Sequence, residues 1–114
     1  MKRDNKVFLQ HILESLEKVK ILTKRLSKEK FLKSWKTQDV VVRRLEIIGE
    51  AAKNVSSDLK EKHADVPWKK LSGLRDILIH QYFDVDLDTT WEIVIRDLPK
   101  LKKEIEKILE NAGN

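Results

Sequence analysis

Apolar residues along this chain recur every three or four positions, and this spacing constrains the fold more than any other feature. In the clearest stretch the steps are four, three, four and three, from Val41 through Leu45, Ile48 and Ala52 to Val55. One face of an α-helix repeats at this interval, whereas a strand alternates at every second residue. With only 3 glycines and 2 prolines to make turns, the chain is predicted to form long helices that pack through their apolar faces.

The same spacing, together with residues that favour helix starts, defines the other helices. The predicted helices are residues 5–26, 28–33, 37–55, 57–62, 67–80 and 89–111. Ser27 is the expected N-cap of the second, Thr89 with Glu92 resembles a capping box for the last, and Pro99 should kink or break that helix. Residues 83–87 are expected to form a loop with its apolar side chains tucked inward. No sustained β-type alternation is present, so the predicted fold is an all-α, up-down bundle of four to five helices.

The length and charge of the chain limit its class. A chain of 114 residues predicts one domain, here residues 1–114. The net charge of +5, from 24 basic and 19 acidic residues, favours an anionic partner, with nucleic acid first in line. The charge alone is a weak indication, because many lysines lie near glutamates at helical spacing, as Lys107 lies near Glu104.

The cysteine content and the distribution of apolar residues indicate the compartment. The chain has no cysteine, which excludes disulfides and thiolate metal sites. Its first residues are polar and resemble no signal peptide, and no apolar run approaches the length that spans a membrane. We therefore expect a cytoplasmic protein.

The residues best suited to chemistry lie between Arg75 and Tyr82. On a straight helix Asp76 and His80, four residues apart, share a face, and so do Arg75 and Tyr82, seven apart. Arg75 and His80 are five residues apart and would be separated by about 140° around the axis. They could converge if the helix ends near His80, or if a second copy of the chain completes the site across a two-fold axis.

These residue types fit the cleavage of RNA by its own 2′-hydroxyl. His80 would accept or donate a proton, Arg75 would neutralise charge on the phosphoryl oxygens, and Asp76 would fix the imidazole tautomer. DNA lacks the attacking hydroxyl and would not be cut. No metal-ligand constellation is visible, so neither a metal nor a cofactor is predicted.

A purely structural interpretation accounts for the same residues and is the simpler one from residue types alone. An arginine paired with an aspartate is common, and a histidine in the last turn of a helix interacts favourably with its dipole. His11 and His63 are expected at the surface, and Tyr82 is expected to be packed with its hydroxyl at the surface. The tryptophans are expected to anchor the core or an interface. They are Trp35, Trp68 and Trp91.

The segment resembles a known family. Arg75-x4-His80-x-Tyr82 matches the Arg-x4-His-x-Tyr motif of HEPN domains, and the chain looks most like the HepT-type toxins. The resemblance extends over nearly the whole chain. The stretch from Arg44 to Lys53 resembles that family's second-helix signature. Further matching segments, in the family's order, are Pro67-Trp68, Gly73-Leu74-Arg75-Asp76, Tyr82-Phe83-Asp84-Val85-Asp86 and Asp97-Leu98-Pro99.

The resemblance implies a homodimeric HEPN-like bundle and a metal-independent endoribonuclease toxin of a toxin–antitoxin pair. Arg75 and His80 of two subunits would line a cleft, and Asp76 stands where such domains commonly have Asn. The implied partner is a minimal nucleotidyltransferase antitoxin that transfers AMP onto Tyr82. Adenylylation would place a phosphate beside Arg75 and block RNA.

Two other functions stay open on the sequence. The chain could be a non-catalytic helical module that binds a nucleotidyltransferase, which needs only a complementary surface. It could also be a basic dimer that binds RNA or DNA without cutting it, with the steep salt dependence of phosphate contacts. Trp35, Val40 and Arg43 are candidates for a dimer interface.

Overall fold

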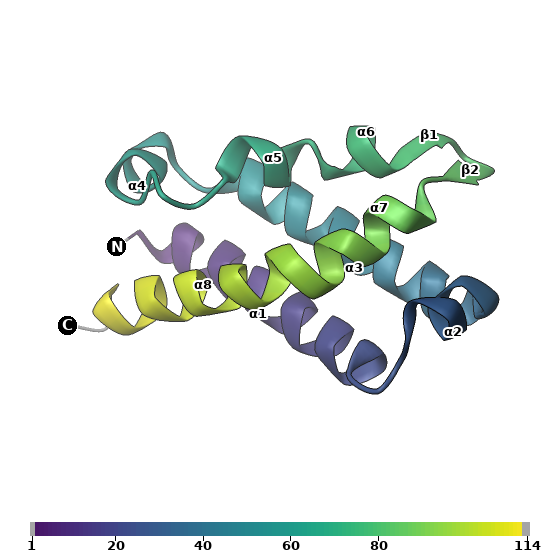
Figure 1. Ribbon diagram of the computed structural model, residues 1–114. Helices are drawn as coiled ribbons and strands as arrows, with labels where there is room; N and C mark the ends of the chain where they lie inside the picture. Colours follow the sequence, from purple (N-terminus) through teal and green to yellow (C-terminus); the bar gives the residue numbers. More distant parts are fainter. Residues whose placement is uncertain (1, 113–114) are drawn as a thin grey trace.

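Two long helices, α1 and α3, pack along each other at the centre of the molecule, and α8 packs against α1 (Figure 1). In the computed structural model, which describes residues 2–112, these helices span Arg3–Thr23, Trp35–Asn54 and Leu98–Ala112. The fold is all-α, as predicted, apart from one small hairpin. The single domain predicted for residues 1–114 extends beyond these limits, because Met1 and residues 113–114 lie outside the described residues.

The remaining elements are short and join the long helices. They are α2 (Lys28–Lys33), α4 (Ser57–Lys62), α5 (Trp68–Ser72), α6 (Leu74–Leu78), β1 (Ile79–Gln81), β2 (Asp84–Val85), α7 (Leu87–Glu92) and the π-helix η1 (Ile93–Asp97). The predicted helices 28–33 and 57–62 match α2 and α4 residue for residue. The hairpin and α2 lie at one end of the molecule and α4 lies at the other (Figure 1).

Serine side chains cap the starts of three helices, α2, α3 and α4, the last of them through Ser56. Ser27 caps α2 as predicted, since its Oγ accepts from the backbone N–H of Lys30 at 3.2 Å. Ser34 does the same for α3, accepting from Thr37 at 3.3 Å. The helix predicted from residue 37 therefore begins two residues earlier, at Trp35.

The core lies where the apolar stripes of α1 and α3 meet. Leu9 and Ile12 on α1 are fully buried against the α3 stripe of Val41, Leu45 and Ile48, which is also fully buried. Burial of apolar area at this density is the dominant favourable term in folding. The periodicity of α3 therefore predicted the core face correctly.

A close approach of α5 to α3 depends on Gly49. A Cβ atom placed on Gly49 would lie 2.8 Å from the backbone oxygen of Leu71 in α5. A methyl group cannot be accommodated at that distance without backbone movement. The small residue thus lets α5, and with it the segment that follows, lie directly on α3.

The prediction of one helix over residues 67–80 is wrong. Gly73 separates α5 from α6, and the chain becomes extended at Ile79, so that β1 pairs with β2 in an antiparallel hairpin. The backbone N–H of Asp86 donates to the Leu78 oxygen at 2.7 Å and closes the base of the hairpin. Strands of three and two residues are too short to show an alternating pattern, so no spacing of apolar residues predicted them.

The last predicted helix continues through Pro99 instead of breaking there. The helix widens before the proline, where the N–H of Leu98 donates to the oxygen of Ile93 five residues back. Pro99 then occupies the first turn of α8, where a missing N–H is tolerated. The predicted break is therefore wrong, and the irregularity at this point is a π-helical turn directly before the proline.

Candidate functional site

The four residues singled out in the sequence lie on three consecutive elements at one edge of the molecule. Arg75 and Asp76 are on α6, His80 is on β1, and Tyr82 is in the hairpin turn. All four are exposed, Tyr82 to 94%. Because His80 is on a strand, the predicted helical face shared by Asp76 and His80 does not exist. The register of the hairpin is irregular at His80, between the pairs Ile79–Val85 and Gln81–Asp84.

Two hollows meet at Arg75. The first, of about 540 Å³, lies between α3 and the hairpin, and its walls include Val42, Tyr82 and Phe83. The second, of about 500 Å³, is more polar and lies between α3 and α6, with Lys53 and Asp76 among its lining residues. Three side chains line both hollows: Arg43, Glu46 and Arg75.

His80 is separated from this arrangement. It lies outside the lining of both hollows, although Ile79 and Tyr82 on either side of it line the first. The structure therefore brings Arg75 together with Tyr82 in one hollow and with Asp76 in the other. Neither of these two hollows contains both the guanidinium and the imidazole of one chain.

Arg43 and Arg75 are available to bind an anion. Among residues 2–112, none of the ion pairs within 4.0 Å includes either arginine, whereas Arg96 pairs with Glu92 at 3.0 Å. Guanidinium groups bind phosphate oxygens through paired, charge-assisted hydrogen bonds. Carboxylates also lie in the hollows, including Glu46, so the local charge is mixed.

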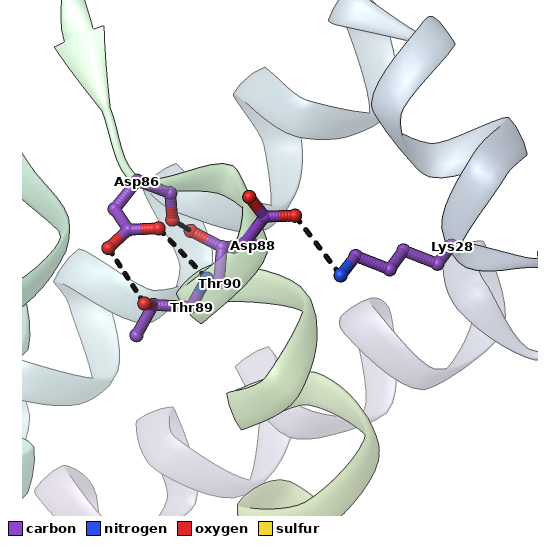
Figure 2. A network of polar contacts seen from close by, with 5 residues as sticks. All are labelled: Lys28, Asp86, Asp88, Thr89 and Thr90. Atoms are coloured by element: carbon purple, nitrogen blue, oxygen red, sulfur yellow. Dashed lines mark hydrogen bonds and ion pairs between the residues drawn. The ribbon is translucent and has the colours of Figure 1, made fainter.

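Asp86 is a residue of this edge that the sequence analysis missed. Its carboxylate caps α7, accepting from the backbone N–H of Thr89 at 2.9 Å through Oδ1 and from the Thr89 hydroxyl at 2.7 Å through Oδ2 (Figure 2). The Thr90 hydroxyl donates to the Asp86 backbone oxygen at 2.7 Å. The expected capping box at Thr89 and Glu92 is therefore wrong, because the helix begins at Leu87 and Thr89 is already inside it.

The hydrogen bonds from Thr89 lower the pKa of Asp86, and the positive charge of His80 lowers it further. Asp is a strong N-cap residue, and its place directly before Leu87 was the available signal. The capping box of Thr89 and Glu92 was chosen in its place, because a two-residue pattern looked more specific than a single Asp.

The observed exposure of the histidine and aromatic side chains confirms some of the predictions and contradicts others. His11 is exposed and His63 is partly exposed. Trp68 and Trp91 are core residues, each 6% exposed, whereas Trp35 is 65% exposed. The inward packing expected for residues 83–87 is wrong for Phe83, which is 70% exposed and contacts Tyr82 edge to face. A packed Tyr82 ring is also excluded by its exposure.

Metal-binding clusters and membrane-spanning helices are both absent from residues 2–112. No three His, Asp or Glu side chains within residues 2–112 are grouped closely enough to hold a metal ion. No helix in the same range is both long and apolar enough to cross a membrane.

The chain matches one family model and several known protein sequences over most of its length. The family model described as "Ribonuclease HepT-like" matches residues 12–108. A protein of Methanocaldococcus jannaschii named "Gamma-glutamylcyclotransferase and putative RNase" is 51% identical over 110 residues. A "Probable ribonuclease HepT" of Thermococcus cleftensis is 44% identical over 108 residues, and a "Putative RNase" of M. jannaschii is 46% identical over 110.

The coverage of these relatives differs. The alignments include 96%, 95% and 96% of this chain, respectively. They cover 50% of the first relative's own length, 98% of the second and 91% of the third. The chain therefore spans about half of the first relative and nearly all of the other two. No solved structure matches the chain.

Proposed function

The chain belongs to the HepT-like ribonuclease family, and from this membership we propose that it is an endoribonuclease toxin that cuts RNA without a metal ion. The observation that supports the proposal most directly is the placement of Arg75. It is exposed, lines two hollows at once and has no carboxylate partner within 4.0 Å among residues 2–112.

Arg75 would hold the scissile phosphate. In the proposed reaction the ribose 2′-hydroxyl attacks the adjacent phosphorus, and the bond to the 5′-oxygen of the next nucleotide breaks. Negative charge builds on the phosphoryl oxygens as this happens, and a guanidinium aimed at them lowers the barrier. The products would be a 2′,3′-cyclic phosphate and a free 5′-hydroxyl.

His80 would move the protons. The reaction removes one proton from the 2′-hydroxyl and delivers one to the leaving 5′-oxygen, and a histidine can do either near neutral pH. His80 lies outside the hollows that Arg75 lines. A homodimer that places His80 of one subunit beside Arg75 of the other would bring the two groups together and supply two imidazoles.

Asp76 is proposed as the residue that orients an imidazole. Since Asp76 and His80 of one chain do not share a helix, this role also requires the second subunit or a rearrangement at the hairpin. Asp76 lines the second hollow with Arg75, where its carboxylate would orient the imidazole of a partner's His80.

Tyr82 is proposed as the site at which a nucleotidyltransferase antitoxin controls the toxin. Its hydroxyl is on a side chain that is 94% exposed, so a second enzyme could reach it. Tyr82 lines the same hollow as Arg75. An AMP group on Tyr82 would bring a phosphate to that arginine and bulk to the hollow, and both would exclude RNA.

The experiment is a cleavage assay of the purified protein on a mixed RNA pool and a matched DNA pool, with a chelator present. We expect the parent to cut RNA only and His80→Ala to cut neither pool. Cleavage of both pools, or cleavage that requires added metal, would contradict the proposal. The intact mass of the preparation is measured first, so that a protein already carrying AMP is not mistaken for an inactive one.

The second candidate is a non-catalytic module that binds a nucleotidyltransferase. It is favoured by the carboxylates around Arg75, since Asp39, Glu46 and Asp76 would repel a phosphate. This function predicts a stable complex with the nucleotidyltransferase and no RNA cleavage by a protein of unmodified mass. RNA cleavage that is lost in His80→Ala would exclude it.

A further inference from the structure

We propose that the hollow between α3 and the hairpin is a subsite for one unpaired nucleotide of the RNA, with the base stacked on Phe83 and the adjoining phosphate on Arg43 and Arg75. The inference rests on the proposed ribonuclease function and deepens it, because it makes single-stranded RNA the substrate. It also gives Arg43 and Phe83 roles in binding the substrate.

The first support is an exposed aromatic pair beside the arginines. Tyr82 and Phe83 are 94% and 70% exposed, and their rings meet edge to face with centroids 5.2 Å apart. Both line the hollow that also contains Arg75. A folded chain normally buries a phenylalanine, so an exposed one at a hollow indicates a contact with something else.

The second support is the position of the two arginines. Arg43 on α3 and Arg75 on α6 line both hollows, so they lie where the two adjoin. Neither takes part in an ion pair among the described residues. A phosphate at this junction would be met from two helices, with its base directed toward the aromatic pair.

The third support is the size and lining of the hollow. Its volume of about 540 Å³ falls within the range of sites that hold small ligands. Val42 and Ile79 provide apolar walls for a base. Asp39 and Glu46 can accept hydrogen bonds from an exocyclic amino group of the base. Glu46 lines both hollows with the two arginines and offsets one of their two charges.

The consequence is a preference for single strands. Bases in a duplex are stacked on their neighbours, and only an unpaired base can leave the stack and lie against a side chain. Stacking on an aromatic ring tolerates any base, so the subsite would select strandedness more than sequence.

The experiment measures binding with probes that cannot be cut. Fluorescently labelled 2′-deoxy oligonucleotides are titrated with the parent protein and followed by anisotropy. One is single-stranded, and the other is a hairpin duplex closed by a non-nucleotide linker, so that it has no unpaired base. We expect the single strand to bind more tightly. Phe83→Ala should weaken its binding roughly tenfold and Phe83→Trp should restore it, as aromatic stacking requires. Binding of the hairpin should not change.

Matched variants control for surface effects. Ile21→Ala removes an apolar side chain that is 74% exposed and lines neither hollow, and it should leave binding unchanged. Arg43→Gln should reduce the slope of log affinity against log salt by about one, since one phosphate contact is lost. Arg25→Gln, which lies in the turn after α1 and lines neither hollow, should not change that slope.

Several results would overturn the inference. Equal affinity for the two probes, unchanged binding in Phe83→Ala, or an equal loss in Ile21→Ala would each contradict it. A change in solution mass in Phe83→Ala would also contradict it, because Phe83 would then be an interface residue. The parent's cleavage of RNA is measured separately. If the parent cuts RNA and Phe83→Ala binds and cuts like it, this inference fails while the proposed function stands. If the parent cuts no RNA, the proposed function fails, and the role given to the subsite fails with it.

Discussion

The α1–α3 core and the segment from Arg75 to Asp86 differ in how far their side chains are exposed to solvent. In the core, side chains such as Leu9 and Leu45 are fully buried. In the segment, Arg75, His80 and Tyr82 are all exposed, although the same chain carries them only a few residues from buried Leu78. A side chain that supplies packing energy is unavailable to a ligand, and one that is available to a ligand supplies little packing energy. Substitutions in the two regions should therefore separate stability from activity.

The largest expected effect is on activity at the exposed edge. Removing the imidazole in His80→Ala should lower the rate of RNA cleavage by about a hundred- to ten-thousandfold, the usual contribution of a general acid or base. The free energy of unfolding should change by less than about 0.5 kcal/mol, because the side chain is exposed. Cleavage kinetics and denaturant unfolding of the same preparation test both parts. A variant that unfolds more easily, or that cuts as fast as the parent, would contradict this separation.

The next effect is on stability in the core. Leu45→Ala removes a fully buried side chain from the α3 stripe and should cost about 2–5 kcal/mol of the free energy of unfolding. The rate of cleavage per folded molecule should stay close to that of the parent at a temperature where the variant is folded. Ile95→Ala, at a side chain that is 49% exposed, is the matched control and should cost far less. Comparable losses in the two variants would break the comparison.

A substitution at Gly49 tests the contact between α3 and α5, through which the exposed segment is attached to the core. Gly49→Ala should destabilise the fold by about 1–3 kcal/mol, because the new methyl group would meet the Leu71 backbone 2.8 Å away and push α5 from α3. Gly73→Ala is the matched control. Its methyl group would lie 3.4 Å from the Lys69 oxygen, and its φ of −95° suits any residue. Thermal unfolding of both variants should separate them, and equal stability would show that α5 can move freely.

The smallest effect concerns the cap at the base of the hairpin. The pKa of Asp86 is lowered in the folded protein, so its contribution to stability is present above the ordinary aspartate pKa and is lost as the pH falls through the lowered value. Asp86→Asn keeps an acceptor for the N-cap but does not titrate there. Stability measured between about pH 2 and pH 7 should therefore fall less steeply in acid for this variant.

Asp88→Asn is the control for Asp86. Asp88 is exposed, and among residues 2–112 its one ion pair is with Lys28 at 3.1 Å (Figure 2). An exposed ion pair of this kind contributes little to stability. Asp88→Asn should follow the parent in acid more closely than Asp86→Asn does. The reverse order would show that the cap is not the source of the acid sensitivity.

The difference between the regions also explains what the sequence could predict. The stripe from Val41 to Val55 predicted α3 and its buried face, because burial imposes a period on every turn of a long helix. Ser27 predicted the start of α2, because a serine before a helical run satisfies free N–H groups. Both predictions depend on interactions that are local or repeated many times.

The hairpin edge follows no repeated pattern. Arg75, His80 and Tyr82 were recognised from their chemical types and from resemblance, but their arrangement was predicted on a helix that ends at Leu78. The turn away from the helix depends on a long-range backbone bond, from Asp86 to Leu78. Exposed residues carry no burial pattern, so the hollows could not be predicted from spacing. The N-cap role of Asp86 had a signal in the sequence, but the apparent capping box at Thr89 and Glu92 was preferred to it.

The most direct test of the central claim, that the exposed edge cuts RNA, is the chemistry of the ends it makes. RNA is incubated with the parent and with His80→Ala in the presence of a chelator, using protein whose mass shows no added AMP, and the new termini are analysed. We predict 2′,3′-cyclic phosphate ends from the parent and none from His80→Ala. The account is contradicted if unmodified parent makes no new ends, or if His80→Ala makes as many.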